Sequence, residues 1–205
     1  MNFPDKKYQI ILADPSWDYT NKVFRKHRIN KYAGSANYHY DTMSVNEIKN
    51  LPVKEIADKN CILFLWTTFP NLQEGLDVIK AWDFTYKTLG FSWLKLNKKN
   101  GKLFFGIGHY TKSNCEVCLI GVKGKPKIID DTISSAIISP RQEHSRKPDI
   151  IRDKIVQLCG DLPRIELFAR QKIPNWDAWG DSPNLQIKPL ESFSHQLINK
   201  ELLLD

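Results

Sequence analysis

The chain has 205 residues, of which 41% are hydrophobic, which suits one well-packed domain and is short for two. No run approaches the ~18 consecutive apolar residues of a membrane helix, and the polar first residues are unlike a signal sequence, so we expect a soluble, cytoplasmic protein. The net charge of +7 is compatible with a polyanionic partner and equally with an ordinary basic surface.

The first predicted element is a strand from Tyr8 to Ala13, and it runs directly into Asp14-Pro15-Ser16-Trp17. A strand this apolar is typical of one buried on both faces of a parallel sheet. Ligands of open α/β sheets bind beyond the carboxyl ends of the strands. The carboxylate, prolyl carbonyl and indole that follow this strand are therefore the first candidates for chemistry.

The segment from Asp18 to Met43 has no regular pattern, and so long a connection inside a compact domain is usually functional or mobile. Basic and aromatic residues are interleaved in it: Lys22, Arg25, Lys26, His27, Arg28 and Lys31 with Tyr19, Phe24, Tyr32, Tyr38 and Tyr40. This combination suits phosphate contacts and base stacking. A solvated loop with a few packed tyrosines is the alternative interpretation.

Capping and periodicity predict the next elements. Ser44-Val45-Asn46-Glu47 has the form of a capping box and predicts a short helix ending near residue 50. Cys61 to Thr67 predicts a second buried strand, and Asn71 to Trp82 has the spacing of an amphipathic helix. Thr85 to Lys95 is an aromatic, strand-like stretch.

Another strand is predicted from Cys115 to Val122, after a lysine-rich turn from Leu96 to Lys102 and a flexible stretch from Gly106 to His109. Cys115 and Cys118 are three apart in that strand and so point to opposite faces. No second pair completes a zinc site, and the chain's four cysteines are too few for a disulfide scaffold. We interpret them as core thiols, and no other cluster suggests a metal.

The last third of the chain contains a polar loop, a helix and a strand. The loop, Ser139 to Lys147, carries Arg141, His144, Ser145 and Arg146. Pro148 and Gly160 bracket a helix from Asp149 to Cys159, and Arg164 to Ala169 is the last central strand. Because strands and helices alternate, we predict a parallel, doubly wound α/β sheet.

Six blocks occur in the order typical of one protein family. They are Asp14 to Trp17, Tyr40 to Ser44, Glu116 to Gly124, His144 to Asp149, Glu166 to Arg170, and Pro174 to Trp176 with Trp179 to Asp181. The chain resembles the MT-A-type (MT-A70-like) adenine methyltransferases from about Tyr8 to Ser182. The resemblance implies a Rossmann-like class I methyltransferase sheet with helices on both faces. It also implies a permuted motif order, in which the catalytic strand precedes the cofactor-binding strand.

The resemblance implies S-adenosylmethionine as the methyl donor and the exocyclic N6 amino group of adenine in nucleic acid as the acceptor. That nitrogen is a poor nucleophile because its lone pair is delocalised into the ring. Two acceptors aimed at its hydrogens localise the pair, and Asp14 and the Pro15 carbonyl are suited to this role. Trp17 is expected to stack on the extruded base.

The cofactor contacts are implied by the matched motif positions. Lys147 resembles the family lysine that meets the methionine carboxylate, and Arg170 the arginine at the ribose. Asp14 borders the same site. Asp181 stands where the family usually has asparagine, and Ser182 replaces a glutamine or glutamate, so the resemblance is weakest at these two positions.

Three further residues have an assigned role or a departure from the family pattern. Ser16 replaces the usual proline, which should cost about 1 kcal/mol of preorganisation while sparing both acceptors. Tyr40 matches an aromatic that borders the catalytic pocket, with core packing as the alternative. Glu166 is an acid in an apolar strand, where a structural partner for a nearby base and a cofactor contact are equally supported.

The function predicted from the sequence is adenine-N6 methylation of nucleic acid, with DNA favoured over RNA because the chain is small. A catalytically silent nucleic-acid-binding partner and a cytosine amino-methyltransferase are the alternatives. Target selection is assigned to loops 18–39, 96–102 and 139–146, or to a partner chain. The expected substrate-binding residues are Tyr40, Lys22, Arg25, Lys26, Arg28, Arg141, His144 and Arg146.

We expect a single methyltransferase domain in residues 1–182, followed by a C-terminal tail or helix at 183–205. We expect no separate recognition module before Tyr8. The resemblance admits a homodimer or a heterodimer and does not choose between them.

Overall fold

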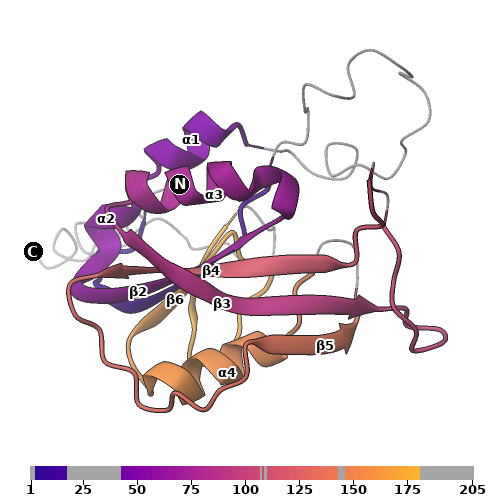
Figure 1. Ribbon diagram of the computed structural model, residues 1–205. Coiled ribbons are helices and arrows are strands. Elements are labelled where there is room, and N and C mark those ends of the chain that lie inside the picture. Colours follow the sequence, from indigo (N-terminus) through magenta and orange to yellow (C-terminus); the bar gives the residue numbers. More distant parts are fainter. Residues whose placement is uncertain (1–2, 18–42, 107, 109, 143–145, 181–205) are drawn as a thin grey trace, which may run out of the picture.

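The structure is a computed structural model that describes residues 3–17, 43–106, 108, 110–142 and 146–180. These residues form a seven-stranded sheet in the order β5-β3-β4-β2-β1-β6-β7, with helices on both faces (Figure 1). The strands are β1 (Tyr8–Ala13), β2 (Ala57–Thr67), β3 (Thr85–Leu96), β4 (Cys115–Lys123), β5 (Ala136–Pro140), β6 (Arg164–Leu167) and β7 (Asp177–Trp179). The helices are α1 (Val45–Asn50), α2 (Val53–Ile56), η3 (Phe69–Asn71), α3 (Leu72–Ala81) and α4 (Ile150–Cys159). The predicted α/β class is confirmed.

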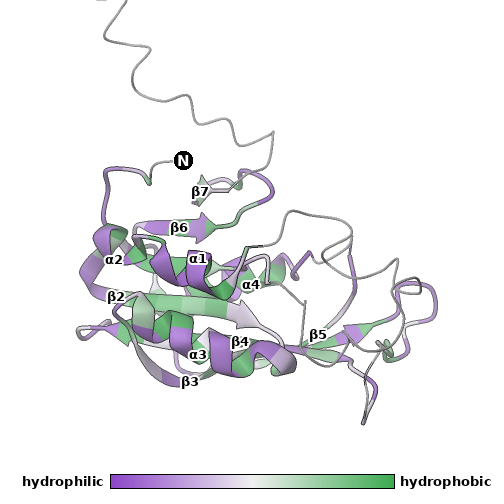
Figure 2. Cartoon of the chain, turned by 90° about the horizontal axis from the view of Figure 1, so that it is seen from above, coloured by the Kyte–Doolittle hydropathy of each residue, from purple (hydrophilic) through white to green (hydrophobic). Residues whose placement is uncertain are grey.

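The sheet is buried on both faces because its central strands carry apolar residues at successive positions. Ile11 of β1 packs into a cluster with Val78 and Ile79 of α3, whereas Ile10 packs on the other side with Ile155 of α4. Figure 2 shows the hydrophobic stretch of β2 at the centre of the sheet. Full burial of each such side chain contributes roughly 1.5–3 kcal/mol. The prediction that the first two strands are buried on both faces is confirmed.

The prediction of a parallel sheet is wrong at β4. This strand pairs antiparallel with β2 on one side and with β3 on the other. The remaining neighbouring pairs, β2–β1, β1–β6, β6–β7 and β3–β5, are parallel. Parallel neighbours need a crossover connection, usually a helix. Among its described residues, the segment that joins β3 to β4 contains no helix, so the chain returns antiparallel.

The predicted helix ends are confirmed where local chemistry defines them. Ser44 caps α1 through a complete capping box, in which its hydroxyl accepts from the Glu47 amide and Glu47 accepts from the Ser44 amide. Helix α4 begins after Asp149, one residue later than predicted, and stops at Gly160. Gly160 has a φ of 92°, which favours glycine.

Several short elements are absent from the sequence prediction. Strand β5 includes Ser139 and Pro140, which we assigned to a polar loop, and β7 and α2 were unassigned. β2 begins at Ala57, earlier than the predicted Cys61. β5 and β7 are the two edges of the sheet, so their exposed or brief patterns carry little periodic signal.

Cys61, Cys118 and Cys159 are buried and Cys115 is half-buried, and all four are free thiols, as predicted. No helix among the described residues is both long and apolar enough to cross a membrane. The predicted tail at 183–205 lies outside the described residues.

Candidate active site

Asp14 lies at the edge of the sheet formed by the carboxyl ends of β1, β2 and β6. Ala13, just before it, is paired with residues near the ends of both neighbouring strands. Arg170 follows β6 and lies close enough for its charge to act on Asp14. Because β4 runs in the opposite direction, its second residue, Glu116, reaches this edge as well. The antiparallel strand therefore adds a carboxylate to the predicted site.

Lys147 connects the two carboxylates of this edge. Its Nζ donates to Asp14 Oδ1 at 2.7 Å and to Asp14 Oδ2 at 2.9 Å, and it lies 3.2 Å from Glu116 Oε2. The other carboxylate oxygen of Glu116 pairs with Lys95 of β3. We call Asp14, Lys147, Glu116 and Lys95 the charge cluster. Their side chains are between 14% and 21% exposed, so these ion pairs are shielded from water far more than surface pairs.

Burial and mutual attraction oppose each other in the charge cluster. Burial raises the pKa of Asp14 above its ordinary value, and this outweighs the lowering effect of Lys147. Burial also acts to raise the pKa of Glu116, but Lys147 and Lys95 outweigh it, so that pKa is lowered. For Lys147, burial is outweighed by the two carboxylates, which raise its pKa. Lys147 thus stays cationic. Of the two carboxylates, Asp14 takes up a proton more readily than Glu116.

The turn after Asp14 is closed by a short backbone hydrogen bond. The Trp17 amide donates to the Pro15 carbonyl at 2.9 Å, so Ser16 is the central residue of a three-residue turn. The Met43 amide donates to the Ser16 carbonyl at 3.1 Å. A carbonyl oxygen has two lone pairs, so Pro15 retains capacity for a second donor.

Trp17 is a core residue in this structure. Its side chain is 4% exposed, and its indole Nε1 donates to the Trp66 carbonyl at 3.0 Å. It also forms a β-bridge with Met43. Trp17 therefore holds the turn against the sheet, and its predicted stacking on a base stays a prediction.

Glu166 forms a paired contact with Arg152 of α4. Two guanidinium nitrogens of Arg152 donate to the two carboxylate oxygens of Glu166 at 2.8 and 2.9 Å. Asp149 accepts from Arg152 at 3.0 Å as well. Both members of the bidentate pair are 13% exposed. The structural interpretation of Glu166 is supported, because its oxygens already tie the last central strand to α4.

Two of the predicted substrate-binding residues are described, and both lie after β5. The guanidinium of Arg141 stacks over the Phe104 ring at 3.6 Å, and Arg146 pairs with Asp149 at 2.8 Å. The other predicted site residues lie outside the described residues: Lys22, Arg25, Lys26, Arg28, Tyr40, His144, Asp181 and Ser182.

Glu116 and Lys95 had no role in the sequence interpretation. The sequence nevertheless marks both residues. Glu116 is an acid inside an apolar strand pattern, and Lys95 is a lysine at the end of an aromatic strand pattern. A charge in such a position usually has a partner. Which partner it has depends on the antiparallel pairing of β3 with β4, in which Trp93 faces Glu116.

Six buried side-chain polar atoms in the described part of the chain have no hydrogen-bond partner, and three of them belong to residues at the carboxyl ends of β2 and β5: Trp66 Nε1, Thr68 Oγ1 and Ser139 Oγ. The Trp66 ring lies 5.7 Å from Lys147 Nζ, beside the charge cluster. Buried polar groups are normally satisfied, so these atoms suit contacts with a polar ligand. Within the described part of the chain, no group of three or more His, Cys, Asp or Glu side chains could hold a metal.

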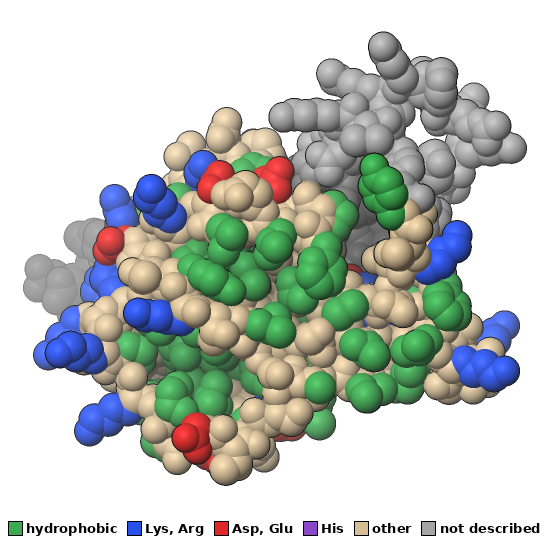
Figure 3. All heavy atoms as spheres, viewed as in Figure 1, with side chains coloured by type: hydrophobic (Ala, Val, Ile, Leu, Met, Phe, Trp, Pro, Cys, Tyr) green, Lys and Arg blue, Asp and Glu red, His purple; other side chains and the backbone are tan. Residues whose placement is uncertain are grey.

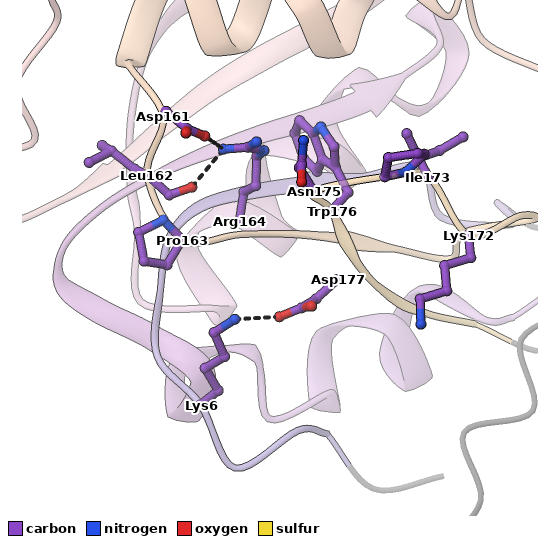
Figure 4. Close-up of a pocket in the computed structure, with 11 residues that line it drawn as sticks. Lys6, Asp161, Leu162, Pro163, Arg164, Lys172, Ile173, Asn175, Trp176 and Asp177 are labelled. Atoms are coloured by element: carbon purple, nitrogen blue, oxygen red, sulfur yellow. Dashed lines mark hydrogen bonds and ion pairs between the residues drawn. The ribbon is translucent and has the colours of Figure 1, made fainter.

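A pocket of about 720 Å³ lies at the amino ends of β6 and β7, the opposite edge of the sheet from Asp14 (Figure 4). Two of its cations are already paired, Lys6 with Asp177 at 2.7 Å and Arg164 with Asp161 at 2.6 Å. These pairs hold the N-terminal segment and the start of β6 in place. The pocket is therefore separate from the candidate active site.

Residues 8–182 match the MT-A70 family, which covers the strand ending at Asp14, the charge cluster and Arg170. The chain belongs to the MT-A70 family. It is 35% identical over 190 residues to the type II methyltransferase M.MunI of Mycoplasma sp, covering 86% of this chain and 78% of that protein. It is 27% identical over 179 residues to the human N(6)-adenosine-methyltransferase catalytic subunit METTL3, covering 85% of this chain and 28% of that protein.

This MT-A70 chain is a methyltransferase, as predicted from its motifs. A Drosophila melanogaster N(6)-adenosine-methyltransferase MT-A70-like protein is 29% identical over 179 residues, covering 85% of this chain and 27% of that protein. The chain thus spans most of the length of M.MunI and little more than a quarter of the animal relatives.

Proposed function

We propose that this MT-A70 chain transfers the methyl group of S-adenosylmethionine to the N6 amino group of adenine in DNA, at the edge of the sheet occupied by Asp14. The observation that carries the proposal is the shielded carboxylate of Asp14, held through both oxygens by Lys147 beside the Pro15 carbonyl. We place the whole catalytic unit in residues 1–182.

Asp14 and Pro15 are the acceptors for the two amino hydrogens of adenine. Each accepted hydrogen bond draws the amino nitrogen toward a tetrahedral shape, which localises its lone pair for attack on the methyl carbon. The new N–C bond forms as the methyl–sulfur bond breaks, and the nitrogen then releases one proton. Burial raises the pKa of Asp14, which suits this carboxylate to accept that proton.

Lys147 has a different role in this proposal from the one implied by the resemblance. Its ammonium contacts Asp14 and Glu116, so we assign it to hold the acceptor carboxylate and to balance the two negative charges. Lys95 balances Glu116 from the other side. A buried carboxylate without such partners would be strongly disfavoured.

The residues at this edge fit S-adenosylmethionine by charge. Bound there, the cofactor supplies an electrophilic methyl group on a sulfonium. Asp14 and Glu116 are suited to its sulfonium and ammonium groups, and the exposed Arg170 to its carboxylate or ribose oxygens. The unpartnered Thr68 and Ser139 hydroxyls support a polar ligand at the same edge.

DNA is favoured over RNA on the length of the relatives. The relative that this chain nearly spans is a type II methyltransferase, whereas the relatives named as N(6)-adenosine-methyltransferases are several times longer. RNA is the second candidate, because the N(6)-adenosine-methyltransferases match over 85% of this chain.

The test is a methyl-transfer assay with labelled S-adenosylmethionine on single- and double-stranded DNA and RNA of the same sequence, followed by nucleoside analysis. We expect N6-methyldeoxyadenosine from the DNA substrates. Methylation confined to the RNA would replace the DNA assignment, and methylcytosine would contradict the base assignment.

Asp14→Ala tests the acceptor role of this carboxylate in the same assay. The variant loses a hydrogen-bond acceptor whose contact with the amino group stabilises the transition state, so kcat should fall by about 100-fold or more. Asp131→Ala, which removes an exposed carboxylate that is not part of the charge cluster, should leave kcat unchanged. A wild-type chain that binds nucleic acid but shows neither cofactor binding in calorimetry nor methyl transfer would instead be a silent partner.

A further inference from the structure

In the segment between β3 and β4, residues 97–114, the described residues 97–106, 108 and 110–114 project from the same edge of the sheet as Asp14 (Figure 1). We call this segment the β3–β4 arm. Two isolated β-bridges hold its backbone together. One pairs Leu96, the last residue of β3, with Leu103, and the other pairs Gly106 with Ser113. A Cβ on Gly106 would meet the Ser113 carbonyl at 2.6 Å, so this approach requires glycine. The arm is therefore a defined extension of the two strands.

Large apolar side chains are exposed on the β3–β4 arm. Tyr110 is fully exposed, Phe105 is 64% exposed and Leu103 is 41% exposed. Figure 3 shows hydrophobic side chains together with lysines or arginines on the projecting part at the right of the molecule. Single exposed apolar residues are common, but several on one short projection mark an interaction surface.

The charge of the β3–β4 arm has one sign. Residues 97–114 contain no Asp or Glu, and their lysines are all exposed: Lys98, Lys99, Lys102 and Lys112. A surface that combines lysines with exposed aromatic rings is complementary to a nucleic-acid strand, whose phosphates are anionic and whose bases have flat faces. Two copies of the arm would repel each other, which disfavours a symmetric contact between chains.

The base of the arm is tied directly to the candidate active site. The Lys95 amide donates to the Asn114 carbonyl at 2.9 Å, and the Lys95 side chain pairs with Glu116 of the charge cluster. The Phe104 ring is covered by Arg141, whose amide donates to the Leu96 carbonyl at 3.0 Å. The arm thus emerges beside the acceptor carboxylate in a fixed direction.

We propose that the β3–β4 arm binds the nucleic acid around the target adenine, with Phe105 and Tyr110 stacking on flanking bases and the lysines contacting phosphates. The inference rests on the proposed function and names a binding surface for it. Extrusion of the target base leaves its neighbours with an unstacked face, which an aromatic side chain can cover.

The test compares a Phe105→Ala/Tyr110→Ala variant with wild type in binding to fluorescent single- and double-stranded oligonucleotides across a salt series. Loss of two stacking contacts should weaken binding by about 30-fold or more and leave the salt dependence unchanged. A Lys98→Ala/Lys99→Ala/Lys102→Ala variant should weaken binding and also make the salt dependence shallower. Both variants should retain wild-type Tm and cofactor binding.

Ile129→Ala is the matched control, because it also removes an exposed apolar side chain, which is 67% exposed. Ile129 lies outside the arm, where its backbone amide donates to Leu158 in the last turn of α4. Wild-type nucleic-acid affinity in the Phe105→Ala/Tyr110→Ala variant would overturn the inference. So would conversion of a dimeric wild type to a monomer in that variant, which would make the arm a contact between copies.

The two proposals fail in distinguishable ways. A wild-type chain that binds oligonucleotides through the arm but transfers no methyl group contradicts the proposed function and supports the arm. A wild-type chain that methylates DNA while the aromatic variant binds normally supports the proposed function and contradicts the arm.

Discussion

Lys147 donates from one ammonium group to both carboxylate oxygens of Asp14, although 133 residues separate the two in sequence. Asp14 directly follows the end of β1, and Lys147 lies in the segment that leads into α4. The same ammonium lies 3.2 Å from Glu116. Orientation and protonation of the proposed acceptor therefore depend on a residue from another part of the chain.

Lys147→Met should destabilise the fold as well as reduce activity. The substitution keeps side-chain volume but leaves Asp14 and Glu116 as shielded carboxylates without their shared cation. Removing one partner of a buried ion pair typically costs about 3–5 kcal/mol of the free energy of unfolding, and this pair is slightly exposed, so we expect about 3 kcal/mol. Urea denaturation measures it, with Lys80→Met as the exposed control. An unchanged midpoint would show that the charge cluster contributes no stability.

The pH dependence of kcat should report the protonation of Asp14. The acceptor must be ionised, and burial raises its pKa, so activity should fall with decreasing pH at a higher pH than for an ordinary aspartate. Lys147 lowers this pKa and Glu116 raises it. Lys147→Met should therefore move the acid limb to higher pH, and Glu116→Gln should move it to lower pH. Profiles of kcat for both variants that shift in the same direction would contradict this electrostatic assignment.

Glu166→Gln should affect stability more than cofactor use. Its carboxylate forms the bidentate pair with Arg152, and an amide cannot accept both hydrogen bonds. We expect the free energy of unfolding to fall by about 1–3 kcal/mol. The KM for S-adenosylmethionine should stay within about twofold, measured at a temperature where the variant is folded. A large rise in KM with unchanged stability would favour the cofactor role instead.

Ser16→Pro should be tolerated and favourable. The hydrogen bond from the Trp17 amide to the Pro15 carbonyl closes a three-residue turn, whose common form has a φ near the value that proline fixes. Proline there should stabilise the fold by roughly 0.4–1 kcal/mol by restricting the unfolded chain. Thermal unfolding measures this, and kcat should rise or stay the same. A lower Tm would mean that proline does not fit the backbone at Ser16.

The elements that local chemistry defines were predictable from the sequence. The apolar run before Asp14 indicates a strand buried on both faces, and the Ser44 capping box and Gly160 define helix ends through contacts within a few residues. Family motifs then predicted Asp14 and Lys147 as site residues. Their direct contact was not predicted, because the motifs carry roles and not distances.

Tertiary structure alone decided the direction of β4, the edge strands β5 and β7, and the membership of Glu116 and Lys95 in the charge cluster. Alternating apolar patterns are the same for parallel and antiparallel strands, so the reversal of β4 leaves no trace in periodicity. The sequence by itself determined which residues carry charge inside an apolar strand. Only the packing of β3, β4 and the segment before α4 decided which opposite charges meet, because that pairing depends on distances across the sheet.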